Sequence, residues 1–175
     1  MKGGKKMKTC IVALLIFSII ITFSSCKTSS LPDEPEDFSF FIRWGVYGIS
    51  SYDSETGKLV KTTDARDPED FVTCYKMSED ELKRVYELIR DLDIEKYPDE
   101  YDPNIGLSSD PFATVVLSVR VGDVEKTVTA EEIALGYEAN THKGQKFLNT
   151  VKEIVDILTA TEEWKALPVY EVIYD

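Results

Sequence analysis

The sequence predicts a single α+β domain, in which an antiparallel sheet built from hairpins carries two main helices packed on one face. Two patterns predict this fold. Several segments alternate apolar and polar residues, which is the period of a β-strand, and short turns join them. Two longer segments repeat apolar residues at helical spacing, and each of them follows a group of strands. Hairpins followed by helices are typical of α+β proteins.

The first half of the domain is predicted to begin with three strands. Alternation over 40–46 predicts the first strand, and residues 52–59 have the composition of a glycine-closed hairpin turn. The second and third strands are expected at 59–63 and 71–75. The third strand contains Cys74, which we expect to be a buried and unreactive side chain.

A helix over 79–92 has the clearest boundaries. Ser78 and Glu81 form the spacing of a capping box, in which each side chain accepts a hydrogen bond from the other residue's backbone N–H. Met77 and Leu82 flank the box as a hydrophobic staple. Apolar residues then recur on one side of the helix, which is the face expected to pack on the sheet.

The second half is predicted to hold a strand, a two-residue turn, another strand, a short helix, a long helix and a closing strand. The strands are expected at 113–121, 124–129 and 169–174, the turn at 122–123, the short helix at 131–135 and the long helix at 147–158. β-Branched residues indicate the first strand, and a Gly-Asp pair indicates the turn. Apolar residues at helical spacing indicate the long helix.

The N-terminal segment has the layout of an export signal. Residues 1–8 carry four lysines and no acidic residue, residues 10–23 are mostly apolar, and Ser24-Ser25-Cys26 follows. A charged start, a short apolar stretch and small residues at the cut are the three parts of a secretory signal. The apolar stretch is shorter than the about 20 residues that a membrane-spanning helix needs.

Ser24-Ser25-Cys26 resembles the lipobox of bacterial lipoproteins. This resemblance implies that residues 1–25 are a signal peptide, that Cys26 carries lipid such as palmitate, and that 26–37 is a flexible acidic tether. The domain would then span 38–175. It also implies an exported protein anchored to the cell envelope, at the outer membrane in a two-membrane host. Two alternatives stay open: ordinary cleavage nearby that releases the protein, and an uncleaved anchor.

Charge restricts the partners. The full chain has 20 basic and 32 acidic residues and a formal net charge of −12. Removal of residues 1–25 would take away four basic residues and no acidic residue, so the remaining chain would have a net charge of −16. Such a surface repels phosphates, so nucleic acid is excluded as a partner. A cationic protein or peptide, or an envelope polymer, is expected instead. After signal removal and lipidation of Cys26, Cys74 would be the remaining free thiol.

The candidate ligand site is the loop 97–110. It offers oxygen ligands from Asp99, Asp102, Asn104, Ser108 and Asp110. Oxygens at alternating positions around a glycine suit calcium, although Pro103 and Ile105 break the usual pattern. The alternative interpretation is a solvated connection between a helix and a strand. Tyrosines at 97, 101 and 137 could instead line a glycan or peptide surface.

Catalytic patterns are not evident. His142 is the single histidine, and it lies in a polar stretch where we expect an exposed residue near a helix start. The surroundings of Cys74 and the serines match no nucleophile motif. The sequence therefore predicts a non-catalytic, envelope-anchored binding module with no cofactor except, in one version, calcium. The alternative is a small hydrolase or calcium-dependent binder that uses 97–110.

Overall fold

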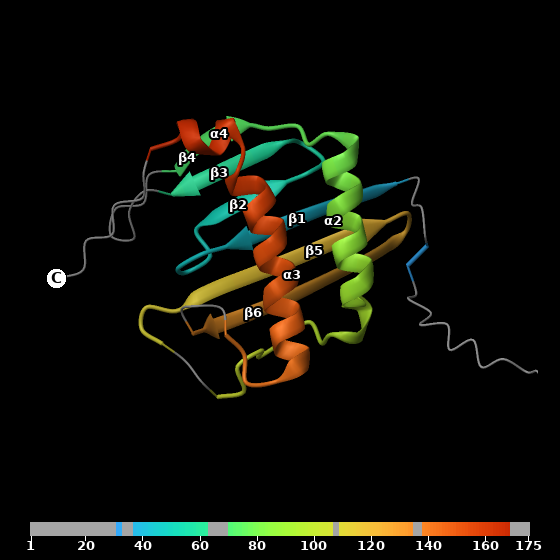
Figure 1. Cartoon of the computed structure of the whole chain (residues 1–175), viewed down its shortest axis with the longest axis vertical. Helices are drawn as coiled ribbons and strands as arrows, with labels where there is room; N and C mark the ends of the chain where they lie inside the picture. The colour runs from blue at the N-terminus through green and yellow to red at the C-terminus, as the bar shows by residue number, and fades with distance from the viewer. Residues whose placement is uncertain (1–30, 33–36, 63–69, 107–108, 135–137, 169–175) are drawn as a thin grey trace, which may run out of the picture.

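Six antiparallel strands form one sheet, with the order β4-β3-β2-β1-β5-β6 across it (Figure 1). The computed structural model describes residues 31–32, 37–62, 70–106, 109–134 and 138–168. The strands are β1 (Phe38–Trp44), β2 (Ser50–Asp53), β3 (Lys58–Thr62), β4 (Asp70–Cys74), β5 (Ala113–Val121) and β6 (Val124–Ile133). The first four form a meander, and the β5–β6 hairpin pairs with the other side of β1.

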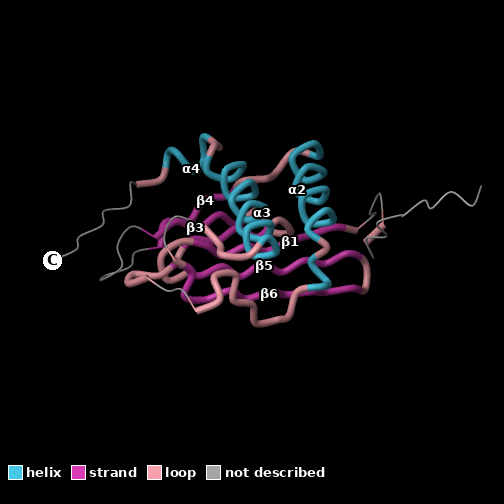
Figure 2. The backbone as a smooth tube through the Cα atoms, turned by 60° about the horizontal axis from the view of Figure 1, so that its bottom comes forward, coloured by secondary structure: helices cyan, strands magenta, loops and turns pink. Residues whose placement is uncertain are grey.

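Two long helices, α2 (Glu79–Leu92) and α3 (His142–Thr159), lie side by side on the same face of the sheet (Figure 1, Figure 2). A 3-10 turn, η1 (Ile94–Lys96), follows α2, and the short helix α4 (Glu162–Ala166) follows α3. The predicted α+β fold with two main helices on one face is confirmed. None of the helices in the described part of the chain combines the length and the apolar character that a membrane crossing needs.

The core lies between the sheet and the helices, because alternate side chains of each strand point towards the helices. In β1, Phe40, Ile42 and Trp44 are buried, whereas Arg43 is exposed on the other face. The fully buried side chains of the two long helices are Val85, Ile89, Leu92, Phe147, Leu148, Val151, Ile154 and Leu158. Burial of one such side chain contributes about 1.5–3 kcal/mol, so this layer is the main source of stability.

The α2 helix begins and ends at the predicted residues. The Ser78 hydroxyl accepts the N–H of Glu81 at 3.3 Å, and a Glu81 carboxylate oxygen accepts the N–H of Ser78 at 2.8 Å. These hydrogen bonds complete the capping box. They hold the pKa of Glu81 below its ordinary value, because the Ser78 groups donate to the charged form. Asp93, in a left-handed conformation with φ of 62°, ends the helix.

The predicted short helix at 131–135 is wrong over its described residues. Strand β6 continues to Ile133, because Ala130 and Ile133 are buried and pair with Val115 and Ala113 of β5. The register between the two strands shifts at this point. Pairing with a long neighbouring strand therefore overrides a local sequence that suits either structure.

The sequence pattern also missed β2. The chain turns sharply after β1, where the N–H of Gly48 donates to the carbonyl of Gly45 at 2.9 Å. Both glycines have positive φ, which glycine adopts without strain. The predicted turn at 52–59 is correct only in its centre, because its first residues belong to β2. The expected closing strand at 169–174 lies outside the described residues.

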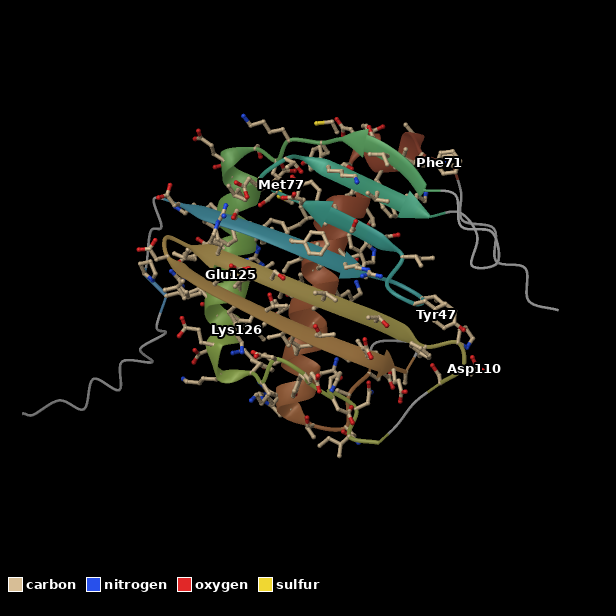
Figure 3. The ribbon with its side chains drawn as sticks, turned by 180° about the vertical axis from the view of Figure 1, so that it is seen from behind. Tyr47, Phe71, Met77, Asp110, Glu125 and Lys126 are labelled. Carbon is tan, nitrogen blue, oxygen red and sulfur yellow. The ribbon has the colours of Figure 1, made fainter. Side chains whose placement is uncertain are left out.

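The expected burial of Cys74 is wrong, since its side chain is exposed. Strand β4 lies at an edge of the sheet, and exposed Val72 and Cys74 share the face that the helices do not cover. Figure 3 shows the sheet from this uncovered side. Alternation in the sequence indicates that the two faces of a strand differ, but it does not tell which face the helices cover.

Two residues ahead of the predicted domain boundary contact the domain. The Leu31 side chain is buried and belongs to the core. The Tyr86 hydroxyl of α2 donates a hydrogen bond to the carbonyl of Pro32. The ring of Phe38 packs edge-on against Tyr86, with 5.0 Å between ring centroids. Contacts of the domain therefore begin seven residues before Phe38, within the segment predicted as a tether.

Candidate functional site: an acidic hollow beside strand β6

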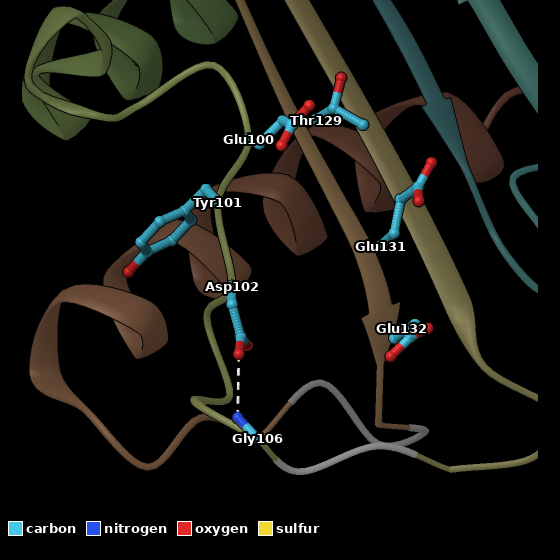
Figure 4. A pocket seen from close by; sticks show the side chains of 7 residues that line it. All are labelled: Glu100, Tyr101, Asp102, Gly106, Thr129, Glu131 and Glu132. Atoms are coloured by element: carbon cyan, nitrogen blue, oxygen red, sulfur yellow. Dashed lines mark hydrogen bonds between the residues drawn. The ribbon is translucent and has the colours of Figure 1, made fainter.

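A hollow of about 530 Å³ lies between the segment 100–106 and the last residues of β6 (Figure 4). We call it the acidic hollow. Its lining residues are Glu100, Tyr101, Asp102, Gly106, Thr129, Glu131 and Glu132. Four of these seven lining residues carry carboxylates, and none of the seven has a basic side chain.

Backbone pairing brings the two walls of the acidic hollow together. Glu100 and Thr129 form a parallel β-bridge. The N–H of Tyr101 donates to the carbonyl of Thr129 at 2.8 Å, and the N–H of Thr129 donates to the carbonyl of Asp99 at 2.7 Å. An ion pair of 2.5 Å between Asp99 and Lys126 lies beside these hydrogen bonds. Residues 99–101 therefore extend the sheet at the outer edge of β6.

An aromatic cluster supports this wall from the core. The ring centroids of Tyr97 and Tyr101 are 4.9 Å apart, and those of Tyr101 and Phe147 are 5.4 Å apart. Tyr97 is buried, which raises its pKa to about 12, and Lys143 lies 4.4 Å from its ring. Tyr97 is therefore a core residue and not part of a binding surface. Tyr101 lines the acidic hollow, and Tyr137 lies outside the described residues.

Asp102 organises the turn at the base of the acidic hollow. One of its carboxylate oxygens accepts the N–H groups of Asn104 and Ile105, each at 2.8 Å. The other oxygen accepts the N–H of Gly106 at 2.9 Å, as Figure 4 shows. The bond from Gly106 is the main reason why the pKa of Asp102 is lowered. Both oxygens of this side chain are therefore directed to the backbone of their own loop.

Asn104 connects the same turn to the segment before α3. It is almost fully buried, and its amide nitrogen donates to the carbonyl of Glu138. Its amide oxygen has no hydrogen-bond partner among the described residues. The preceding residue, Pro103, is also buried, and its carbonyl approaches Gly144 in the first turn of α3. The loop is thus packed on the domain.

The five predicted ligand residues do not gather as one set in the described structure. Asp102 and Asn104 share a turn, but Asp99 is paired with Lys126. Asp110 is exposed, lies near Tyr47 (Figure 3), and is not among the residues that line the acidic hollow. Ser108 lies outside the described residues. Within the described ranges, no group of three or more His, Cys, Asp or Glu side chains could hold a metal ion. The calcium site stays a prediction.

Glu100, Glu131 and Glu132 form most of the acidic lining, and none of them is among the predicted ligand residues. The predicted short helix at 131–135 contains Glu131 and Glu132, whereas the structure places both residues in β6. Glu132 has a φ of 55°, a left-handed conformation that costs a non-glycine residue about 1 kcal/mol or more. As expected, His142 is exposed at the start of α3, where Thr141 is the N-cap.

The chemistry of the acidic hollow follows from its side chains. Ionised carboxylates only accept hydrogen bonds, whereas ammonium and guanidinium groups only donate them. The acidic hollow is therefore complementary to lysine or arginine side chains. Comparison of the chain with protein-family models gives no match, and a search of curated proteins gives none either.

Proposed function

We propose that this protein is a lipid-anchored module of the bacterial cell envelope that binds a cationic segment of a protein or peptide partner at the acidic hollow. One observation carries the binding part of this proposal: four carboxylates and no basic side chain line a hollow of about 530 Å³. The net charge of the whole chain, −12, has the same sign and would attract the same partner from a distance. No reaction is proposed for the acidic hollow.

The affinity would come from several weak, exposed ion pairs. Each such pair contributes about 0.5 kcal/mol, so the binding should depend on several carboxylates and weaken with salt. The screening length falls from about 10 Å at 0.1 M salt to about 3 Å at 1 M salt. Electrostatic complementarity of this kind speeds association and selects partners by their charge.

The test is the binding of a fluorescent decalysine peptide, measured by fluorescence anisotropy at low and high salt. The triple variant Glu100→Gln, Glu131→Gln, Glu132→Gln is expected to bind about tenfold more weakly, from three lost pairs of about 0.5 kcal/mol each. Asp102 is left unchanged, because its carboxylate holds the turn together. A peptide with acetylated lysines should not bind, since it has lost its charge.

A matched control separates the acidic hollow from the general charge of the surface. The variant Glu87→Gln, Glu153→Gln, Glu162→Gln removes the same number of charges from the helical layer, at α2, α3 and α4. This control should bind decalysine nearly as well as the unchanged protein. Equal losses in the two triple variants would contradict the proposal, because the peptide would then respond only to net charge.

The anchoring part of the proposal rests on the N-terminal sequence ending in Ser24-Ser25-Cys26. Its test is the intact mass of the protein purified from host membranes, beside the variant Cys26→Ala. The expected mass lacks residues 1–25 and includes acyl chains, and the variant should carry no acyl mass. A mature protein without lipid in the soluble fraction would overturn the anchor and leave the binding experiment unaffected.

A further inference from the structure

The docking of Leu31 restricts how an anchored domain can stand on a membrane. Leu31 is buried in the core, and the carbonyl of Pro32 accepts a hydrogen bond from Tyr86. We infer that the end of the sheet that carries the β5–β6 turn lies closer to the lipid bilayer than the opposite end. This inference rests on the proposed lipidation of Cys26.

Several contacts place the entry of the chain at this end of the sheet. Tyr86, which binds Pro32, packs against Phe38 at the start of β1. Phe38 pairs with Val121, the last residue of β5, and the N–H of Gly122 donates to the carbonyl of Asp37 at 3.1 Å. In Figure 1 the blue segment at 31–32 lies beside the turn between β5 and β6. We call this the near end.

The opposite, far end of the sheet lies at the other end of β1. There Val46 bridges to Ala113, the first residue of β5, and the ring of Tyr47 packs edge-on against Phe112 at 4.9 Å between centroids. Tyr47 is exposed over 42% of its surface. Strand β5 runs from Ala113 at the far end to Val121 at the near end, and at about 3.4 Å per residue it places the two ends about 27 Å apart.

The connection between Cys26 and the domain is too short to allow the far end of the sheet to lie against the membrane. Residues 27–30 are all that lies between Cys26 and Leu31, and a fully extended connection of that length spans at most about 18 Å. A lipidated Cys26 stays at the membrane surface. With the far end against the membrane, Leu31 would be about 27 Å or more from the surface, beyond the reach of this connection.

In this orientation the end of β6 that lines the acidic hollow is the end farther from the lipid. Strand β6 begins with Val124 at the near end and finishes with Ile133, which pairs with Ala113 at the far end. Glu131 and Glu132 therefore lie in the half of β6 that is remote from the membrane. A partner in the aqueous space can reach these carboxylates, and they are kept apart from anionic headgroups that would repel them.

The test is nuclear magnetic resonance of the mature chain, 26–175, on nanodiscs that contain lipids with gadolinium-chelated headgroups. The variant Cys74→Ser is joined through Cys26 to a maleimide phospholipid, so that the anchor does not depend on biological lipidation. The amide signals of Gly122 and Asp123 are expected to be lost, whereas those of Tyr47 and Gly48 should keep their intensity. Equal loss at both ends, or a greater loss at Tyr47, would overturn the inference.

A control variant has a long Gly/Ser linker inserted between Ser30 and Leu31. Such a linker behaves as a flexible coil and removes the restriction on orientation, so the difference between the two ends should disappear. If the difference persists with the linker, a direct affinity for lipid orients the domain and the short connection does not. Because the anchor is attached chemically, failure here is distinct from failure of the proposed lipidation, which the intact mass reports.

Discussion

Substitution of Phe147 by alanine is expected to lower the free energy of unfolding by about 4 kcal/mol. The Phe147 side chain is fully buried, and its ring contacts the rings of both Tyr97 and Tyr101. Removal of the ring leaves a cavity under the wall of the acidic hollow and takes away the packing that holds Tyr101. Urea unfolding followed by tryptophan fluorescence measures this change. If the slope of the unfolding free energy against urea concentration is unchanged, the variant has kept its fold.

Two further variants make this result specific to the aromatic cluster. Phe147→Leu keeps most of the apolar volume and should cost about 1 kcal/mol. Ile89→Ala removes a fully buried side chain from α2 and should cost about 3 kcal/mol. Only Phe147→Ala should also weaken decalysine binding under conditions where the protein is folded. Unchanged binding in that variant would show that the cluster does not support the acidic hollow.

Gly144→Ala is expected to destabilise the domain by about 2 kcal/mol, although alanine is the better helix former. A Cβ atom at Gly144 would lie 2.2 Å from the carbonyl oxygen of Pro103 and 2.9 Å from the Thr141 hydroxyl oxygen. The first distance is far below van der Waals contact, and a backbone group cannot move aside as a flexible side chain can. The overlap should therefore outweigh the about 1 kcal/mol that alanine gains in helix propensity.

Gly106→Ala provides the contrast. Gly106 has a φ of 76° and no atom within 4 Å of the position of an added Cβ. This variant should lose about 1 kcal/mol from backbone strain alone. Thermal unfolding of both variants tests the comparison. If the Gly144→Ala protein is as stable as the unchanged protein, the carbonyl of Pro103 is not in close steric contact with α3.

Features set by neighbouring residues could be predicted from the sequence. Ser78 and Glu81 lie three residues apart and cap the helix through each other's backbone, so the start of α2 needed no knowledge of the rest of the chain. The turn at Gly122 is equally local. In both cases the deciding hydrogen bonds or dihedral angles involve residues within one turn of each other.

Features set by distant pairing could not be predicted in this way. Glu131 follows a segment that suits a helix or a strand, and the pairing of Ile133 with Ala113 decides between them. The acidic hollow exists because Glu100 bridges to Thr129, far along the chain. Cys74 shows the same limit, since burial on a strand depends on which face the helices cover.

The packing of Leu31 also affects how the folded domain should be prepared in the laboratory. A fragment that starts at Phe38 would lack the Leu31 side chain, which exposes apolar core surface to water, and the Pro32 carbonyl, which accepts the Tyr86 hydroxyl. Newly exposed apolar surface promotes aggregation. Fragments for biophysical work should therefore begin ahead of Leu31, so that their solubility and melting behaviour represent the intact domain.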